Sequence, residues 1–316
     1  MRDKRDFPPR YRTFNEQLQE MFGSRVRRIP VDAGFDCPHR DRARNRPGCL
    51  YCDDTGSGAP FLRTDLSVQE QLLHGISGAR ERYGDTLFLP YFQAYTNTNA
   101  DVDRLRNLYL EALSVPDVVG IAVGTRPDTV PNSVLDLLEE LAIQQQVWLE
   151  FGLESRHNDT LRRMNRQHTF QDVQDAVHRA QDRGLHLCLH MILGLPGENR
   201  EQMLETADAM AELNVEGVKI HSFYIDRTMP LFQDYQADNI TFMERDEYIE
   251  LAIDVLERLP EHMIIHRLIG AGNRRTFVAP LWAIEKAPML RSIHKRMAER
   301  DTWQGQAVQA KISLES

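Results

Sequence analysis

Short apolar segments alternate along the chain with longer segments of helical periodicity. Between residues 68 and 83, apolar side chains recur every three or four residues, which is typical of an amphipathic helix that buries one face. The intervening segments are short and rich in β-branched and other apolar residues, as expected for strands buried on both faces. Strands are therefore predicted at residues 26–35, 86–92, 118–123, 147–153, 185–193 and 217–225.

This alternation predicts an α/β fold in which parallel strands are joined by right-handed helical crossovers. Six strand–helix units favour a partial (β/α)6 TIM-like barrel over a complete barrel of eight. We expect a helical lead-in over residues 1–25, the barrel over 26–241, and a C-terminal α+β flank over 242–316 that packs on the barrel.

Composition and charge narrow the expected location and partners. The N-terminal residues lack the apolar core of a signal peptide, and no apolar run reaches the roughly 18 residues of a membrane span, so we expect a cytoplasmic protein without a membrane partner. The net charge of −9 argues against broad binding to nucleic acids, although it does not exclude a local basic patch. One such patch is the arginine run within residues 40–46, and another spans Arg267 to Arg275. Either is a candidate contact for an anionic substrate.

Three of the four cysteines, Cys37, Cys49 and Cys52, lie in one loop with the pattern C-x11-C-x2-C. Two thiolates separated by two residues can bind a single metal ion or a cluster. The spacing alone leaves a zinc site, with His39 as the nearby fourth ligand, and a 4Fe–4S cluster equally open. Free structural thiols are a third interpretation. Three thiolates without a fourth suit a cluster with one open iron, and the loop follows the first predicted strand, at the end of a barrel where chemistry takes place.

With these observations in place, the sequence resembles the radical S-adenosylmethionine (SAM) superfamily. The resemblance rests on the cysteine loop, with aromatic Tyr51 before the last cysteine, and on further motifs in the same order along nearly the whole chain. These motifs occupy residues 34–38, 91–97, 124–128, 150–155, 164–168, 194–198, 266–267 and 279–282. The chain is similar to a little-characterised bacterial group near the elongator-subunit, tRNA-methylthiotransferase and oxygen-independent coproporphyrinogen oxidase branches. Its first cysteine spacing departs from the C-x3-C-x2-C pattern usual in the superfamily.

The resemblance implies two cofactors and a radical reaction. A 4Fe–4S cluster would be held by Cys37, Cys49 and Cys52, and SAM would bind its open iron. The cluster would reductively cleave SAM to a 5′-deoxyadenosyl radical that abstracts a hydrogen atom from an unknown substrate. Such an enzyme needs an electron donor such as flavodoxin or ferredoxin. The protein positions the cofactors and excludes water and oxygen.

By the same resemblance, eight residues are candidate SAM contacts. Gln93, Thr96 and Asn97 follow the second predicted strand, where relatives bind the methionine amine. Arg166 matches an arginine that reaches the SAM carboxylate, for which a guanidinium is well suited. The other candidates are Tyr51 beside the cysteines, Glu154 and His190 near the ribose, and Gly194 near the adenine.

Two alternative functions remain open at this stage. One is a non-enzymatic scaffold that binds zinc or a cluster for structural reasons, although such a protein does not need the strand motifs or the stretch around Arg166. The other is a tRNA-modifying radical SAM enzyme, against which stand the acidic balance and the lack of an added RNA-binding domain. Cys188 lies in an apolar run and is expected to be a small buried hydrophobic residue. His221, on the last predicted strand, is a candidate substrate-facing group.

Overall fold

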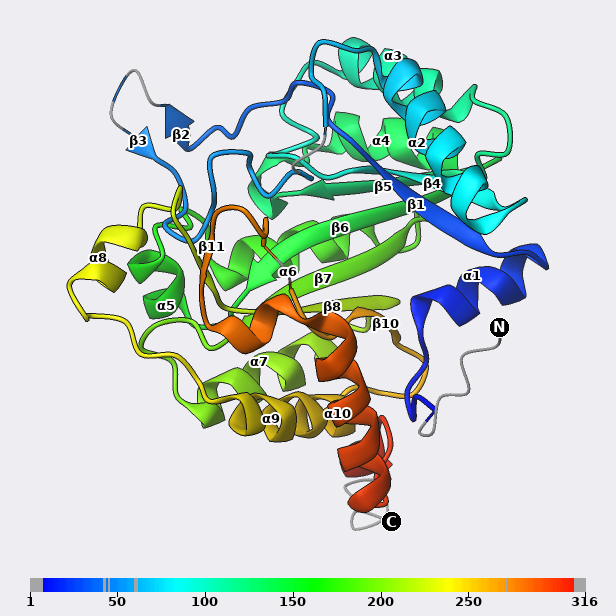
Figure 1. The fold of residues 1–316 in the computed structure, drawn as a ribbon. Helices are drawn as coiled ribbons and strands as arrows, with labels where there is room; N and C mark the ends of the chain where they lie inside the picture. Colours follow the sequence, from blue (N-terminus) through cyan, green and yellow to red (C-terminus); the bar gives the residue numbers. More distant parts are fainter. Residues whose placement is uncertain (1–7, 42–43, 45, 60–61, 271, 310–316) are drawn as a thin grey trace.

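The computed structural model of the protein describes residues 8–41, 44, 46–59, 62–270 and 272–309. Its main sheet has seven parallel strands in the order β1-β4-β5-β6-β7-β8-β10. The strands are β1 (Val26–Val31), β4 (Leu87–Phe92), β5 (Gly120–Thr125), β6 (Gln146–Glu154), β7 (His186–Leu193), β8 (Gly217–Ser222) and β10 (Ile264–Arg267). Figure 1 shows these strands side by side in one curved sheet with helices around its outside.

The predicted fold class, an α/β partial barrel, is confirmed. Each of the six predicted strand segments overlaps one strand of the sheet, although the first ends at Val31 and its remainder forms the loop that leads to the cysteines. The seventh strand, β10, comes from the segment that the sequence analysis places in the C-terminal flank. It pairs in parallel with β8, so the flank contributes directly to the sheet.

The outer helices begin where the sequence supplies capping side chains. The side chains of Ser67, Thr169 and Asn199 each accept a hydrogen bond from the backbone N–H three residues later. In return, the side chain at that later position accepts a hydrogen bond from the backbone N–H of the cap residue. The helices are α1 (Phe14–Phe22), α2 (Val68–Tyr83), α3 (Val102–Leu113), α4 (Asn132–Ala142), α5 (Asn158–Arg163), α6 (Phe170–Ala180), α7 (Arg200–Glu212), α8 (Phe232–Gln236), α9 (Arg245–Arg258) and α10 (Lys286–Glu299).

A small apolar cluster closes the N-terminal end of the barrel. Phe14 and Leu18 of α1 pack there against Trp148 of β6, and the ring centroids of Phe14 and Trp148 are 4.9 Å apart. The backbone beside α1 is fixed to the sheet because Ile265 N–H donates to the carbonyl oxygen of Arg12 (2.8 Å). Since side chains fill this end, the open space of the barrel lies at the C-terminal ends of the strands.

The last part of the chain covers one side of the barrel mouth. Helices α9 and α10 pack against each other, and β11 (Phe277–Ala279) pairs antiparallel with β9 (Ile225–Asp226). The loop from β10 to β11 and the first residue of α10 thereby come to the rim of the barrel. Within the described part of the chain, no helix is long and apolar enough to cross a membrane.

Candidate functional site

A cavity of about 650 Å³ occupies the C-terminal end of the barrel. It is lined by the ends of β5, β6 and β8, by the cysteine loop, and by residues of the C-terminal flank. Its volume lies within the range of small-molecule and cofactor sites. The site is therefore where a TIM-like barrel carries its chemistry.

Cys37, Cys49 and Cys52 all line this cavity, and all three are free thiols. Cys49 is buried, while the other two are half-buried. A turn closes between Cys52 N–H and the carbonyl oxygen of Cys49 (3.1 Å). Leu50, one of the two residues between them, is anchored because its N–H donates to the carbonyl oxygen of Met164 (3.0 Å). The stretch at residues 164–168 therefore helps to hold the cysteine loop in place.

Three guanidinium groups lie beside the sulfurs of Cys49 and Cys52. Nη1 of Arg166 lies 3.5 Å from Cys49 Sγ, and Nη1 of Arg126 lies 3.9 Å from the same sulfur. Nη1 of Arg40 lies 3.9 Å from Cys52 Sγ. These cations favour a negatively charged sulfur ligand set, because opposite charges at such distances attract strongly in a partly buried site.

Arg166 is held in a tight arrangement with the end of β6. Its Nη2 donates to the carbonyl oxygen of Gly152 (2.8 Å) and lies 3.4 Å from Oε1 of Glu154. A Cβ atom on Gly152 would clash with both side chains, so glycine permits the close approach. Glu154 has a φ of 67°, a left-handed conformation that is uncommon for a non-glycine residue and is found at functional sites. Burial raises the pKa of the Glu154 carboxyl group, and the Arg166 guanidinium opposes that shift.

The chemistry of the three sulfurs fits a metal cofactor. Burial, with further contributions from Cys49 and Asp53, raises the pKa of Cys52 to about 12. A thiol with such a pKa stays protonated at neutral pH unless a metal centre binds its sulfur. Cys37, Cys49 and Cys52 line one cavity as free thiols, so they are able to hold a metal cofactor together, and the guanidinium groups beside Cys49 and Cys52 would balance the charge of the thiolates.

The spacing of the sulfurs is wider than a single zinc ion requires. The sulfurs of the three loop cysteines do not all lie within 4.8 Å of one another. Within the described ranges, Glu150, Cys188 and His190 are the one group of possible metal ligands that meets this distance. Thiolates on one zinc ion at about 2.3 Å would be about 4 Å apart. The candidate fourth zinc ligand, His39, is hydrogen-bonded to Asp128 (2.9 Å) and does not line the cavity. The arrangement suits a larger cluster better than a mononuclear site.

The structure brings most of the other candidate residues to this cavity. Tyr51, Gln93, Thr96, Glu154, Arg166 and His190 line it together with the three cysteines. Gln93 also donates from Nε2 to the carbonyl oxygen of Ser57 (2.6 Å), which ties the end of β4 to the loop after Cys52. These positions agree with a cofactor site, and the individual contacts stay predictions.

Two candidates lie outside the cavity lining. The Asn97 side chain is buried and donates from Nδ2 to the carbonyl oxygen of Gly124 (2.8 Å), so it joins two strand ends. Gly194 has a φ of 88° at the end of β7, and its N–H points to Sδ of Met203 (3.0 Å). In this structure both residues support the backbone beside the cavity.

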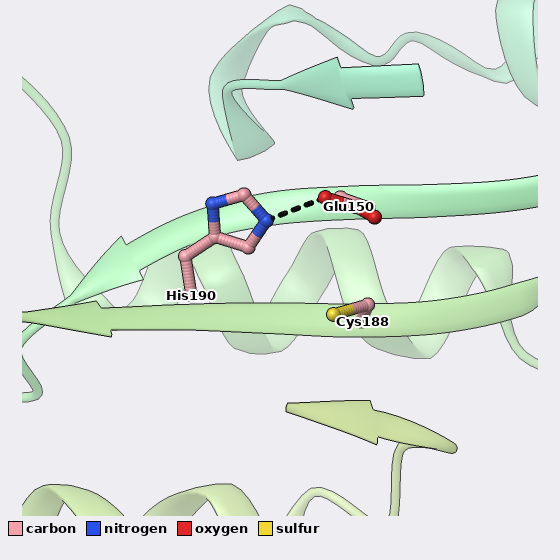
Figure 2. A group of neighbouring side chains, drawn as sticks. All are labelled: Glu150, Cys188 and His190. Carbon is pink, nitrogen blue, oxygen red and sulfur yellow. Dashed lines mark hydrogen bonds and ion pairs between the residues drawn. The ribbon is translucent and has the colours of Figure 1, made fainter. Parts of the chain in front are cut away.

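Below the cavity, one carboxylate organises a group of buried cations and histidines. Oε2 of Glu150, on β6, accepts hydrogen bonds from Lys219 Nζ (2.7 Å) and His190 Nε2 (2.8 Å). Figure 2 shows the His190 ring, on β7, directed at Glu150 on the neighbouring β6, with Cys188 on the same strand as His190. Nη1 of Arg28 and Nδ1 of His266 each lie 3.4 Å from Oε1 of Glu150. We refer to Glu150 with Lys219, His190, Arg28 and His266 as the Glu150 network.

The charge states of the Glu150 network follow from burial and from these contacts. Burial alone would raise the pKa of Glu150, but the Lys219 ammonium and the hydrogen bond from His190 hold it well below its ordinary value. Burial lowers the pKa of Lys219 to about 8 and that of His190 to about 4. Glu150, Cys188 and His190 do not need a metal ion. The Glu150 carboxylate already has the Lys219 ammonium as its counter-ion, and burial raises the pKa of the Cys188 thiol, so that it stays neutral. The expectation that Cys188 is a buried hydrophobic residue agrees with its full burial.

Comparison with known proteins identifies the family. The model of the radical SAM superfamily matches residues 37–210, and that of the Radical_SAM C-terminal domain matches residues 215–299. The chain belongs to the radical SAM superfamily, and the resemblance inferred from its motifs is confirmed.

Individual relatives extend over almost the whole chain. The chain is 38% identical to the uncharacterised protein YtqA of Bacillus subtilis (strain 168) over 303 residues, which cover 95% of this chain and 93% of that protein. It is 38% identical to protein YhcC of Escherichia coli (strain K12) over 272 residues, covering 85% and 86% respectively. The solved structure of the archaeal Methanocaldococcus infernus Elp3 with an N-terminal deletion is similar in fold, with a TM-score of 0.66 at 16% identity. That similarity covers 88% of this chain and 64% of the Elp3 chain.

Several residues of the site were not identified from the sequence. Arg126 lies within the 124–128 motif but had no assigned role, and Lys219 had none either. The signal for Lys219 was available, because a lysine in the middle of an apolar strand is almost never buried without a partner. Its partner, Glu150, could not be found without the strand order, since the two residues are 69 positions apart.

Proposed function

We propose that the protein is a radical SAM enzyme that carries a 4Fe–4S cluster on Cys37, Cys49 and Cys52. The observation that carries the proposal is the convergence of these three thiols on one cavity at the mouth of the barrel, in a chain of the radical SAM superfamily. When bound, the cluster supplies the electron that cleaves SAM to methionine and a 5′-deoxyadenosyl radical, which takes a hydrogen atom from the substrate.

The residues of the chain bind, orient and shield these cofactors. Arg166, Arg126 and Arg40 offset the negative charge of the thiolates through the sulfur contacts given above. The residues at the end of β4, with Glu154 and His190, offer polar groups on the same cavity for the bound SAM. The apolar cluster at the N-terminal end closes the barrel behind them, which limits the access of water to a reactive radical.

The proposal includes partners that the site does not itself identify. An external one-electron donor, such as flavodoxin or ferredoxin, reduces the cluster. The substrate is a separate molecule that enters the cavity beside the cofactors. The protein works in the cytoplasm, where reducing conditions keep the three thiols free to bind metal.

The test is anaerobic reconstitution with iron and sulfide, followed by dithionite reduction and addition of SAM. We expect an electron paramagnetic resonance signal of the reduced cluster that changes when SAM is added, together with slow formation of 5′-deoxyadenosine. Cys52→Ala should lose the cluster iron, whereas Cys188→Ala, the matched control, should keep it. Stoichiometric zinc without a cluster, or equal iron in the two variants, would overturn the proposal in favour of a metal-binding scaffold.

A further inference from the structure

The charged residues that line the cavity are unevenly distributed. The acidic ones are Asp53 and Asp54, in the loop after Cys52, and Glu154 at the end of β6. Asp53 is occupied by its own loop, because its Oδ1 accepts from the N–H groups of Thr55 (3.0 Å) and Ser57 (2.8 Å). Among the described lining residues, none contributed by β8, β10 or α10 is acidic. We refer to Lys219, His221, Ser222, Arg267 and Lys286 as the basic wall.

Two cations of the basic wall have no counter-ion within the described chain. Lys219 pairs with Glu150, but the side chains of Arg267 and Lys286 form neither an ion pair nor a hydrogen bond with a described residue. They are near one another: partial burial, then Arg267, then Arg28 lower the pKa of Lys286 to about 8. Burial likewise lowers the pKa of Arg267. Keeping two like charges together at a partly buried site is costly unless an anion compensates them.

The Glu150 network cannot supply that compensation. Its single carboxylate already faces the Lys219 ammonium at 2.7 Å and the Arg28 guanidinium at 3.4 Å. The histidines nearby add no negative charge. The Glu150 carboxylate is therefore the single negative charge near four cations, which are Arg28, Lys219, Arg267 and Lys286. An excess of positive charge faces the open cavity.

Unpartnered polar atoms lie on the same wall. His221 Nε2 and Ser222 Oγ are buried and have no hydrogen-bond partner among the described residues, and both side chains belong to residues that line the cavity. Burial lowers the pKa of His221 well below its ordinary value, so the neutral imidazole is available as a hydrogen-bond donor or acceptor. A guanidinium, an ammonium, an imidazole and a hydroxyl together form a donor set suited to an oxyanion.

We propose that the basic wall binds an oxyanion of the substrate, a carboxylate or a phosphate group, through Arg267 and Lys286. This inference rests on the proposed function, because it treats the cavity as an active site that a substrate enters beside the cofactors. It also divides the basic cluster recognised in the sequence. Arg267 and Asn273 line the cavity, whereas Arg274 and Arg275 are exposed and do not.

The test is residue-resolved labelling of lysine amines by acetic anhydride at pH 8, read by mass spectrometry of the full-length protein. The chain has five lysines, and Lys295, on the same helix as Lys286 and exposed, is the internal control. Inorganic phosphate or acetate should slow the labelling of Lys286 and leave Lys295 unchanged. If a bound anion raises the pKa of an amine from about 8 to about 9, the fraction of free base at pH 8 falls about fivefold, and the labelling slows by the same factor.

The variants separate a built site from simple screening. Arg267→Gln should abolish the protection of Lys286, while Arg274→Gln, an exposed arginine of the same region, should retain it. Phosphate protection without acetate protection would identify a phosphate site, and the reverse would identify a carboxylate site. If Arg267→Gln itself misfolds, as circular dichroism would reveal, titration calorimetry of phosphate binding to Lys286→Gln against the wild type takes its place, and equal affinity overturns the proposal.

Three results would overturn the inference. The first is equal protection by chloride at matched ionic strength, and the second is unchanged protection in Arg267→Gln. The third is a loss of SAM affinity in Arg267→Gln, which would assign the oxyanion to the cofactor. Because the labelling requires no turnover, it reports on the basic wall even if SAM is not cleaved, so its failure is distinct from failure of the proposed function.

Discussion

Replacing Glu150 with glutamine removes one charge from the interior and leaves the shape of the side chain almost unchanged. Glu150 is fully buried and accepts hydrogen bonds from Lys219 and His190. In this variant the Lys219 ammonium remains buried beside Arg28 without a counter-ion, and its polar partners are the neutral glutamine amide and the hydroxyl of Tyr91 (2.7 Å). Removing one partner of a buried ion pair typically costs about 3–5 kcal/mol of unfolding free energy.

That cost is a large share of the roughly 5–15 kcal/mol that stabilises a typical protein. Urea unfolding followed by circular dichroism should show it directly. With a denaturant dependence of about 3 kcal/mol per molar urea, the midpoint for Glu150→Gln should fall by roughly 1–2 M. The exposed pair Arg106–Glu140 is the matched control, and Glu140→Gln should barely change the midpoint.

A double-mutant cycle decides whether the pair is the cause. Glu150→Gln combined with Lys219→Met removes both charges, so the double variant should be less destabilised than the sum of the two single variants. Additive losses would show that Glu150 stabilises the fold through contacts other than Lys219. A wild-type midpoint for Glu150→Gln would refute the electrostatic reasoning altogether.

Two further predictions concern charge near the cavity. Arg126→Gln should lower the reduction potential of the reconstituted cluster by tens of millivolts, because a positive charge 3.9 Å from Cys49 Sγ favours the reduced state, and Arg126→Lys should restore most of the difference. A potentiometric titration followed by electron paramagnetic resonance measures this, and equal potentials in the three proteins would contradict it. Burial lowers the pKa of His266 to about 3, below its unfolded value, so the unfolded chain binds the proton first as the pH falls and stability is lost below about pH 6.5. At pH 5 this histidine costs up to about 2 kcal/mol of unfolding free energy. The urea midpoint of His266→Gln should therefore fall less between pH 7 and pH 5 than that of the wild type. Equal falls in the two proteins would exclude His266 as the source.

The apolar pattern predicted the sheet well because the strands are buried on both faces. Segments such as 185–193 are almost continuously apolar, and the structure places β7 (His186–Leu193) within that segment. The exception is β10 (Ile264–Arg267), which has only two apolar residues before a histidine and an arginine. Its membership in the sheet depends on pairing with β8, which a short local pattern cannot reveal.

The candidate site was predictable to the extent that a local motif encodes it. The cysteine loop carries its own spacing, and the structure brings its three thiols to the cavity. The contacts of the Arg166 guanidinium with Cys49 Sγ and the carbonyl oxygen of Gly152 depend on how the loop after α5 (Asn158–Arg163) returns to the end of β6. No local sequence pattern specifies that path. The basic wall was only partly accessible from the sequence. Arg267 belongs to a basic patch that the sequence analysis named, but Lys286 lies on a different element, after β11 (Phe277–Ala279), and no local pattern joins the two.

The charge balance of the cavity links the two proposals. The chain as a whole has a net charge of −9, yet its cavity holds Arg126, Arg166 and Arg267. Arg126 has Asp128 (2.9 Å) and Arg166 has Glu154 (3.4 Å) as acidic partners within the protein, and the thiolates of the first proposal would add negative charge beside both arginines. The side chain of Arg267 has no acidic partner among the described residues, so the substrate oxyanion of the second proposal would be its counter-ion. A ligand that binds the folded state alone stabilises it according to its concentration and affinity. The reconstituted protein with a bound oxyanion should therefore be more stable toward urea than either singly loaded form, and the gain from the oxyanion should vanish in Arg267→Gln.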